Sequence, residues 1–277
     1  MHCACRLRWA KSALTIARSH RNAMLQLVTI PCLSDNYAFL VHNADTGETA
    51  CFDVPEAAPI LAALKERGWR LTDILLTHHH ADHIQGVPEL VAATGARVTG
   101  AAADAHRLPP LDRAVTPGER VPLCGTEAAV IDVSGHTIGH VAYHLPAAAM
   151  VFTGDSLMAL GCGRLFEGTA PMMWESLGRL AALPPETAVC SGHEYTAGNA
   201  RFARTIEPDN PALISRIAAV EAARAEGRPS VPSMLGEELE TNPFLRAGHA
   251  GVKSALGMDD AEDAAVFGAI RAAKDRF

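Results

Sequence analysis

The stretch THHHADH, residues 77–83, places four histidines and an aspartate within seven positions. Its first residue, Thr77, ends DILLT, residues 73–77, an apolar run typical of a buried strand. The histidines then lead into a helical pattern that starts near Val87. A loop at the carboxyl end of such a strand is where α/β folds gather functional groups. The position of the cluster therefore predicts a functional site at the edge of a sheet.

The spacing within this loop predicts two adjacent metal sites rather than one. Alternate side chains of an extended turn point the same way, so His78 and His80 are expected to converge while His79 turns aside. Asp82 and His83 come just before the helix and are expected to face a second point nearby. A metal site with an open position needs about three protein ligands per ion. Further ligands must therefore come from elsewhere in the chain.

Three candidates for these ligands stand at the ends of other strand-like runs. AVIDVSG leads to His136, MVFTG to Asp155 and TAVCSG to His193. Each follows a glycine, which lets the backbone turn sharply, and the two oxygens of Asp155 suit it to bridging two cations. Singly, each histidine would be an ordinary core or surface residue and Asp82 a helix N-cap, but the joint pattern favours metal binding. The remaining histidines are interpreted as structural, at positions 2, 20, 42, 79, 106, 140, 144 and 249.

The composition is that of an ordinary globular protein. The 277 residues are 48% hydrophobic and 20% charged. The net charge of −7 argues against electrostatic attraction to nucleic acid or to an anionic membrane surface. No apolar run reaches the roughly 18 residues of a transmembrane helix. The seven cysteines form no CxxC motif, so a reducing compartment, the cytoplasm, is expected.

We expect three segments: a basic extension at 1–23, a strand-rich catalytic domain at 24–196 and a helical domain at 197–277. The first segment holds five Lys/Arg and no acidic residue. It is interpreted as the product of an upstream start codon, with Met24 opening the protein proper. An Arg-rich transit peptide, which would direct the protein to mitochondria, is the alternative.

The pattern of the chain predicts an α/β fold. Short β-like runs recur between residues 24 and 196, with helical patterns such as EAAPILAALKERG at 56–68 and MMWESLGRLAAL at 172–183 between some of them. Many strands and few helices indicate sheets covered by helices rather than a strictly alternating nucleotide-binding fold. No dinucleotide or phosphate-loop glycine motif occurs. From about residue 197 the pattern is helical.

Several segments resemble a known family. The HxHxDH motif resembles the metallo-β-lactamase superfamily, and IPCLSDNYAFL, TGDSLMALGCGRLFEGTAPMMWESL, CSGHEYT and ETNPFLR resemble the glyoxalase II (hydroxyacylglutathione hydrolase) family within it. The similarity extends from residue 24 to 277. It implies a metallo-β-lactamase-like αββα sandwich followed by a C-terminal helical domain that binds glutathione.

The resemblance also implies site residues. Two divalent metal ions are expected, zinc foremost, although iron and manganese also suit His and Asp ligands. The resemblance implies that the first ion is bound by His78, His80 and His136. The second ion is bound by Asp82, His83 and His193, and Asp155 binds both ions. The implied glutathione contacts are Arg164, Tyr195, Arg271 and Lys274.

One departure concerns the glutathione contacts. The family often has Lys-Phe-Tyr where this chain has Arg164, Leu165 and Phe166. The positive charge is kept, but the hydroxyl is lost, which is expected to weaken binding by about 1 kcal/mol. Taken without the resemblance, Arg271 and Lys274 would be ordinary partners of a helix C-terminus.

The activity implied by the resemblance is hydrolysis of S-(2-hydroxyacyl)glutathione at a binuclear metal site. S-D-lactoylglutathione would give glutathione and D-lactate, as in methylglyoxal detoxification. Asp82 is expected to orient the attacking water or accept its proton. A monomer acting on this small molecule is expected, with no nucleic-acid or membrane partner. The alternatives are a glutathione persulfide dioxygenase with a single iron and a lactonase of the same fold; the acidic charge disfavours an RNA-processing nuclease.

Overall fold

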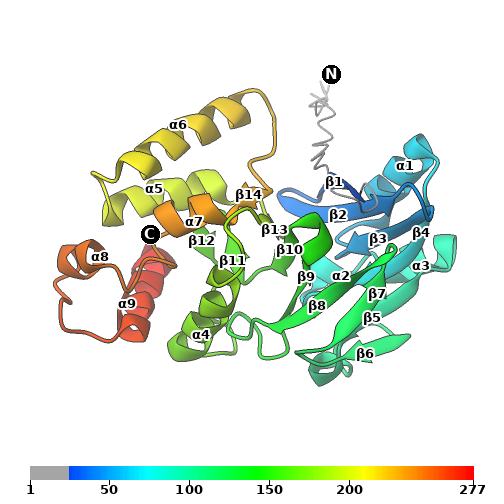
Figure 1. Ribbon diagram of the computed structural model, residues 1–277, viewed down its shortest axis with the longest axis horizontal. Helices are drawn as coiled ribbons and strands as arrows, with labels where there is room; N and C mark the ends of the chain where they lie inside the picture. Colours follow the sequence, from blue (N-terminus) through cyan, green and yellow to red (C-terminus); the bar gives the residue numbers. More distant parts are fainter. Residues whose placement is uncertain (1–24) are drawn as a thin grey trace, which may run out of the picture.

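Two six-stranded sheets packed face to face form the centre of the molecule (Figure 1). The computed structural model describes residues 25–277, so the basic extension at 1–23 and the start predicted at Met24 lie outside the described residues. The first sheet has the order β1 (Leu25–Cys32), β2 (Asn36–Asn43), β3 (Glu48–Phe52), β4 (Arg70–Leu75), β5 (Arg97–Ala101) and β6 (Arg113–Val115). The second has the order β14 (Ser233–Met234), β13 (Ala188–Ser191), β10 (Met150–Gly154), β9 (Val141–Leu145), β8 (Thr126–Asp132) and β7 (Arg120–Leu123). A separate ribbon pairs β11 (Leu157–Met158) with β12 (Gly161–Cys162).

Helices cover the outer face of each sheet. The apolar faces of α1 (Ala57–Arg67) and α3 (Val87–Thr94) pack on the first sheet. Those of α4 (Ala170–Ala181), α5 (Thr196–Ile206) and α9 (Asp263–Arg276) pack on the second. The expected αββα sandwich with a helical C-terminal part is confirmed. The remaining helical segments are α2 (Ala81–Ile84), α6 (Pro211–Ala225), α7 (Leu235–Thr241), α8 (Ala250–Ala255), η1 (Ala102–Asp104) and η2 (Pro146–Ala148).

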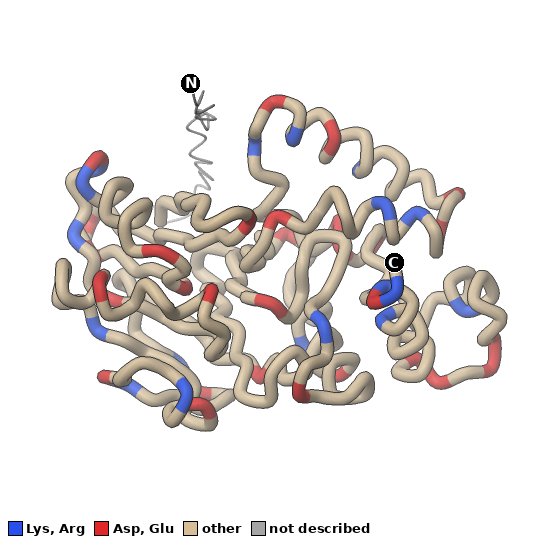
Figure 2. The backbone as a smooth tube through the Cα atoms, turned by 180° about the vertical axis from the view of Figure 1, so that it is seen from behind, with Lys and Arg blue, Asp and Glu red and all other residues tan. Residues whose placement is uncertain are grey.

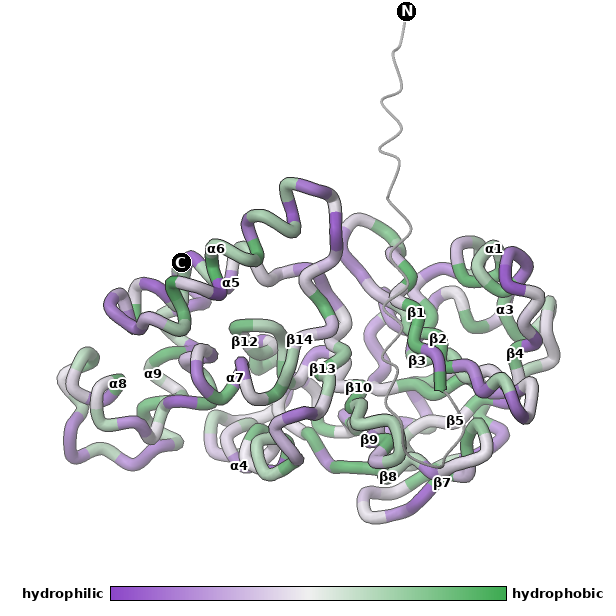
Figure 3. The backbone as a smooth tube through the Cα atoms, turned by 45° about the horizontal axis from the view of Figure 1, so that its top comes forward, coloured by the Kyte–Doolittle hydropathy of each residue, from purple (hydrophilic) through white to green (hydrophobic). Residues whose placement is uncertain are grey.

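Aromatic rings fill the space between the sheets. Phe52 of β3 stacks on Phe152 of β10 with ring centroids 3.5 Å apart, and Phe39 meets Phe152 edge-on at 5.7 Å. Each such ring contributes roughly 1.5–3 kcal/mol by leaving water. Tyr143 is fully buried beside them, and its hydroxyl donates to the carbonyl of Leu76 at 3.0 Å. The strands accordingly carry much of the hydrophobic colour in Figure 3.

The strand directions bring three loop ends to one edge of the second sheet. β10 and β13 are parallel, and β9 is antiparallel to both β8 and β10, so β8 also runs in the direction of β10. The segments that follow β8, β10 and β13 therefore leave the sheet on the same side. These segments carry the three distant residues predicted to join the histidine cluster.

Local sequence signals explain where several helices begin and end. α1 ends at Gly68, whose φ of 67° lies in the left-handed region that glycine adopts without a steric penalty. α4 begins at Thr169, whose hydroxyl accepts from a backbone N–H, and α6 begins with the amide of Asn210 in the same role. Pro211 then occupies the first helical turn of α6, where a missing N–H costs nothing.

The structure differs from the sequence-based expectation in two places. The segment 81–84, expected to lie just before a helix that starts near Val87, itself forms the short helix α2. A strand was also not expected beyond residue 197, but β14 adds to the edge of β13 through Ser233 and Met234. Two residues are too few to produce a readable alternating pattern. The domain boundary at 196/197 stays a prediction.

A buried ion pair ties the helical part to the sandwich. Glu238 of α7 is fully buried and accepts from Arg216 of α6, and its other oxygen accepts from the backbone N–H of Leu160 at 2.9 Å. Asn242 donates to the same carboxylate at 3.1 Å. Leu160 lies in the turn between β11 and β12, so one carboxylate joins two helices to this ribbon.

Charges are distributed along the whole chain. Figure 2 shows Lys and Arg interspersed with Asp and Glu. Among residues 25–277, no helix has the length and apolar character needed to cross a membrane.

Replacement of Glu238 by alanine is expected to lower the free energy of unfolding by about 3–5 kcal/mol, because Arg216 would stay buried without its counter-charge. Urea denaturation followed by circular dichroism measures the change. Glu237→Ala, on the exposed side of the same helix, is the control and should change stability by less than about 0.5 kcal/mol. Equal stability of the two variants would show that the buried pair has no structural role.

Candidate metal centre

The predicted ligands meet where the loops leave the two sheets. Among the described residues, three sets of three side chains have ligand atoms within 4.8 Å of one another, and one of them joins His78 and His83 to Asp53. The other two consist of predicted ligands, and each joins the 77–83 loop to a distant loop. The two sets are His78, His80 and His136, and Asp82, His83 and His193. We call them the first and the second triad.

Three ring nitrogens converge in the first triad. Nδ1 of His80 lies 3.1 Å from Nε2 of His78 and 2.9 Å from Nε2 of His136. The opposite nitrogen of His78 donates to the Thr77 hydroxyl at 3.0 Å, because that hydroxyl already donates to a carboxylate. Nδ1 of His136 donates to the carbonyl of Arg164 at 2.8 Å. Nε2 of both rings therefore presents a lone pair to the centre of the triad, as in metal-binding histidines.

The second triad follows the same rule. Nε2 of His83 and Nε2 of His193 lie 3.3 Å apart. Their Nδ1 atoms donate outward, to Asp53 at 2.8 Å and to Asp35 at 3.0 Å. Oδ2 of Asp82 approaches Nε2 of His193 at 3.4 Å. Carboxylate partners on the outer nitrogen fix the ring orientation and make the inner nitrogen a better ligand.

Asp155 lies between the two triads. Its Oδ1 is 3.3 Å from Nε2 of His83, and its Oδ2 is 3.3 Å from Nε2 of His193 and 3.5 Å from Nε2 of His136. Oδ1 is buried and makes no hydrogen bond. A buried acceptor without a donor is costly in a folded protein. Oδ1 thus faces the second triad, and Oδ2 lies between one histidine of each triad, so the carboxylate is placed where it could contact cations in both.

The electrostatics of the centre favour positive charge. Burial alone would lower the pKa of His83, but the carboxylates of Asp155 and Asp53 outweigh it and raise the pKa well above the usual value. Burial likewise opposes ionisation of Asp155, yet His83 and His193 hold its pKa well below the usual range. The same carboxylates would attract a divalent cation.

Burial keeps the first triad neutral. It lowers the pKa values of His78, His80 and His136, with repulsion among the neighbouring rings adding to the effect for His78 and His80. A neutral imidazole is the form that binds metal. The nitrogen lone pairs converge, one carboxylate oxygen has no hydrogen-bond donor, and all the donors are His or Asp. This combination fits metal ions, so the cluster can hold a metal.

Strained backbone supports the site at Asp53. This residue follows β3 and has a φ of 55°, in the left-handed region that non-glycine residues rarely adopt. Its carboxylate accepts from the backbone N–H and the hydroxyl of Thr77, both at 2.8 Å, as well as from His83. One carboxylate thereby orients a ligand of the second triad directly and a ligand of the first, His78, through Thr77.

Sequence reasoning missed several of these supporting residues. His140, interpreted as structural, is fully buried and stacks on His78 at 4.6 Å, and its Nε2 accepts from the backbone N–H of Asp155 at 3.1 Å. Burial lowers its pKa to about 3, so it stays neutral and able to accept. A second GH pair in SGHTIGH was the available signal. Asp35 and Asp53 gave no signal, because their partners are distant in sequence.

A cavity of about 770 Å³ opens from the metal centre. Its walls include ligands from both triads and Asp155. The four residues predicted to bind glutathione, Arg164, Tyr195, Arg271 and Lys274, all line it. A further cation, Arg201, was not predicted and lines it as well.

The cationic residues of this cavity differ in how free they are. Arg271 is buried, donates to the carbonyl of Cys162 at 2.8 Å and pairs with Asp275 at 2.9 Å. Lys274 is half-buried, and its ammonium lies 3.3 Å from the carbonyl of Gly198. Burial lowers the pKa of Lys274, and repulsion from Arg271 and other arginines lowers it further. Mutually repelling cations at one end of a cavity indicate an anion-binding region.

Two aromatic side chains flank the metal centre. The exposed ring of Phe166 meets His136 and His80 at centroid distances of 5.2 and 5.7 Å. The ring of Tyr195 stacks on His193 at 4.5 Å. Burial, aided by nearby carboxylates, raises the pKa of Tyr195 to about 12, so its hydroxyl keeps its proton and can donate.

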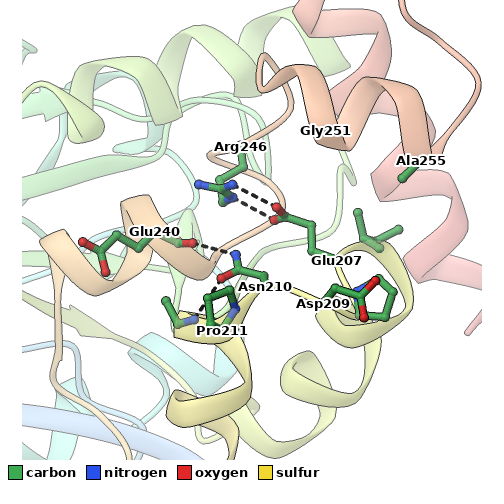
Figure 4. A pocket seen from close by; sticks show the side chains of 11 residues that line it. Glu207, Asp209, Asn210, Pro211, Glu240, Arg246, Gly251 and Ala255 are labelled. Carbon is green, nitrogen blue, oxygen red and sulfur yellow. Dashed lines mark hydrogen bonds and ion pairs between the residues drawn. The ribbon is translucent and has the colours of Figure 1, made fainter.

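A second cavity, of about 590 Å³, lies among α5, α6, α7 and α8, away from this centre (Figure 4). Its most prominent charges are already paired, because Arg246 donates to both oxygens of Glu207 at 2.7 and 2.9 Å. Asn210 caps α6 and donates to the carbonyl of Glu240 at 3.0 Å. These contacts are structural, so the candidate site is the larger cavity.

Two family models match the chain. Residues 44–193 match the metallo-beta-lactamase superfamily, and residues 194–277 match the hydroxyacylglutathione hydrolase C-terminus. The first covers the segment that carries all seven predicted metal ligands, and the second covers most of the helices that supply cations to the cavity.

Curated relatives are similar over most of their length. A hydroxyacylglutathione hydrolase of Cereibacter sphaeroides is 67% identical over 91% of this chain and 99% of its own. One of Jannaschia sp. is 66% identical over 91% of this chain and 98% of its own.

Solved structures share the fold. TTHA1623, in a di-iron-bound form, superposes with a TM-score of 0.58 and 28% identity, over 79% of this chain and 99% of that one. ETHE1 from Myxococcus xanthus superposes with a TM-score of 0.60 and 25% identity, over 90% of this chain and 97% of that one. The chain belongs to the hydroxyacylglutathione hydrolase family of the metallo-β-lactamase superfamily.

Proposed function

We propose that this chain hydrolyses S-(2-hydroxyacyl)glutathione thioesters, and that S-D-lactoylglutathione, split into glutathione and D-lactate, is its substrate in methylglyoxal detoxification. The observation that carries the proposal is a pair of His/Asp triads, with Asp155 between them, that opens into a cavity lined by cationic side chains. The name shared by the close relatives supports the same activity. It does not favour the persulfide dioxygenase or the lactonase.

The resident metals in this proposal are two zinc ions. The first triad would hold one ion and the second triad the other, with Asp155 placed to bind both. Histidine and carboxylate donors suit zinc, and they also suit iron and manganese. When bound, the ions polarise the thioester carbonyl and supply a water of lowered pKa at neutral pH.

The side chains of the centre orient the reactants. Asp82 is partly exposed toward the cavity, and its Oδ2 accepts from the amide of Asn36 at 3.1 Å. Burial opposes its ionisation, but His83 and Asn36 lower the pKa of Asp82 below the usual value. An ionised Oδ2 at this position orients the attacking water and accepts its proton. The departing thiolate has a conjugate acid of pKa about 8.5, so no separate general acid is needed.

The cationic end of the cavity binds the glutathione moiety. Arg164, Arg201 and Lys274 line this end of the cavity, and Tyr195 offers a hydroxyl. The carboxylate of Asp275 also lies here, but it pairs with Arg271 at 2.9 Å. The carboxylates of glutathione would pair with these cationic side chains. Their concentration here explains how a chain with a net charge of −7 attracts an anion.

We further propose that the protein acts as a monomer in the cytoplasm. The five cysteines among the described residues are unpaired thiols, which suits a reducing compartment. They are also buried, which keeps them from cross-linking chains.

Asp155→Ala is expected to lower turnover of S-D-lactoylglutathione by at least about 100-fold, since even outer partners of metal ligands typically contribute 10–100-fold. The purified variant should also hold less metal than the wild type, measured by atomic emission, while its circular dichroism spectrum is kept. Asp209→Ala, an exposed substitution near the second cavity, is the control. Wild-type turnover by Asp155→Ala would refute the binuclear site.

Lys274→Ala is expected to raise KM about 10- to 100-fold with a smaller effect on kcat, because a charge-assisted hydrogen bond contributes roughly 1.5–3 kcal/mol. Arg276→Ala, on the exposed face of the same helix, should leave KM unchanged. Steady-state kinetics of both variants make the comparison. If the Lys274 variant kept the wild-type KM, this end of the cavity would not bind the substrate.

A further inference from the structure

His79, the histidine of the 77–83 loop that belongs to neither triad, has partners of its own. Nδ1 of His79 donates to Oδ2 of Asp104 at 3.1 Å, and its Nε2 lies 3.7 Å from Glu167. Arg107 donates to Asp104 through Nε at 3.1 Å and reaches Glu167 with its two outer nitrogens. These four residues come from three separate stretches of chain. We call them the His79 cluster.

Asp104 joins η1 to the loop that carries His136. Its side chain is almost completely buried, with both oxygens engaged by His79 and Arg107. Its carboxyl group lies directly against the backbone at Gly139, where a Cβ atom would collide with it. Any larger residue at Gly139 would therefore displace either the loop or Asp104.

Glu167 joins the same loop to the wall of the substrate cavity. Its Oε2 accepts from the backbone N–H of Ile138 at 2.8 Å. The neighbouring Phe166 donates its N–H to the carbonyl of His136 at 3.2 Å, and Nδ1 of His136 donates to the carbonyl of Arg164. The hydrogen bonds from Arg107 hold the pKa of Glu167 at about 2, so the carboxylate stays charged at neutral pH.

We propose that His79, Asp104, Arg107 and Glu167 are positioning residues that hold the loops of the first metal triad and of the substrate cavity in register. The proposal rests on the proposed function, because it assigns a role within the same site. His79 fixes the loop beside His80. Glu167 and Asp104 fix the backbone two and three residues after His136, at Ile138 and Gly139 respectively. Arg107 connects the two carboxylates.

The contacts predict a selective effect. In the first triad, His80 and His136 belong to loops held by the His79 cluster. In the second triad, Asp82 and His83 share the 77–83 loop with His79, but the rings of His83 and His193 are oriented by Asp53 and Asp35 instead. Weakening the His79 cluster should therefore weaken one metal site and leave the other almost unchanged. A purely structural ion pair would affect both sites together or neither.

Arg107→Ala is the decisive variant, because Arg107 is partly exposed and its removal leaves both carboxylates in place. Zinc is titrated into the metal-free full chain in competition with a chromophoric chelator, and His80→Ala identifies the constant that belongs to the first triad. We expect the dissociation constant of the first triad to rise at least about tenfold, and that of the second to change less than about threefold. KM for S-D-lactoylglutathione should rise as well, since Phe166 and Arg164 line the cavity.

Arg113→Ala is the matched control. Arg113 lies on the edge strand β6 and pairs with Glu119. Its replacement should leave both zinc dissociation constants and KM unchanged. Glu167→Gln and the double variant Arg107→Ala/Glu167→Gln complete a mutant cycle, in which the double variant should be little worse than Arg107→Ala alone. Additive effects would contradict a shared role for the two residues.

Unchanged zinc constants in Arg107→Ala, or an equal rise in both, would overturn the proposal. Gly139→Ala offers a second route to the same test, because it displaces Asp104 without removing a charge, and the same selective loss is expected. Failure of the proposed function has a different signature. A wild-type chain that binds zinc but does not hydrolyse the thioester would refute the activity, while the zinc constants would still decide the role of the His79 cluster.

Discussion

Repulsion between inward-facing lone pairs is the constraint on which this site depends. His78, His83, His136 and His193 each give the proton of their outer nitrogen to a protein oxygen. When the four rings are neutral, their inner nitrogens and the carboxylate of Asp155 crowd one small volume with unshared electron pairs. Only positive charge relieves such crowding, so the hydrogen bonds on the outside of the rings define a cation site at the centre.

The sandwich supplies the geometry that this constraint requires. Strands β8, β10 and β13 run in the same direction, so the loops behind them emerge at one edge, facing the loop after β4. The aromatic core between the sheets fixes the distance across this edge. Where regular pairing ends, glycines allow the sharp turns: Gly154 has a φ of 48°, and a Cβ atom there would collide with the Thr77 side chain. Tight packing thus reaches the residues that hold the ligands.

Much of the fold and of the candidate site follows from local sequence. Strand-end positions pointed to the seven residues that the structure brings together. Four lie in the HHHADH loop directly after a buried strand, and the other three each follow a strand-like run that ends in Gly. The residues that hydrogen-bond to these predicted ligands could not be identified from the sequence. Asp35 lies 158 residues from His193, and the contact depends on how the turn between β1 and β2 meets the segment after β13. His79 was interpreted as structural because the alternation in the loop turns it aside from His78 and His80. Its partner Asp104 was not foreseen, since the two meet only where η1 packs against the 77–83 loop.

The helical part adds a second level of control to the same loops. Arg271 donates to the carbonyl of Cys162, and Glu238 accepts from the N–H of Leu160, so α9 and α7 both hold the β11–β12 ribbon that leads to Arg164. The carbonyl of Arg164 in turn orients His136. Residues that face the substrate cavity and residues that face the metals are therefore parts of one hydrogen-bonded path. By this path, a change in the position of α9 is expected to reach the first triad as well as the cavity.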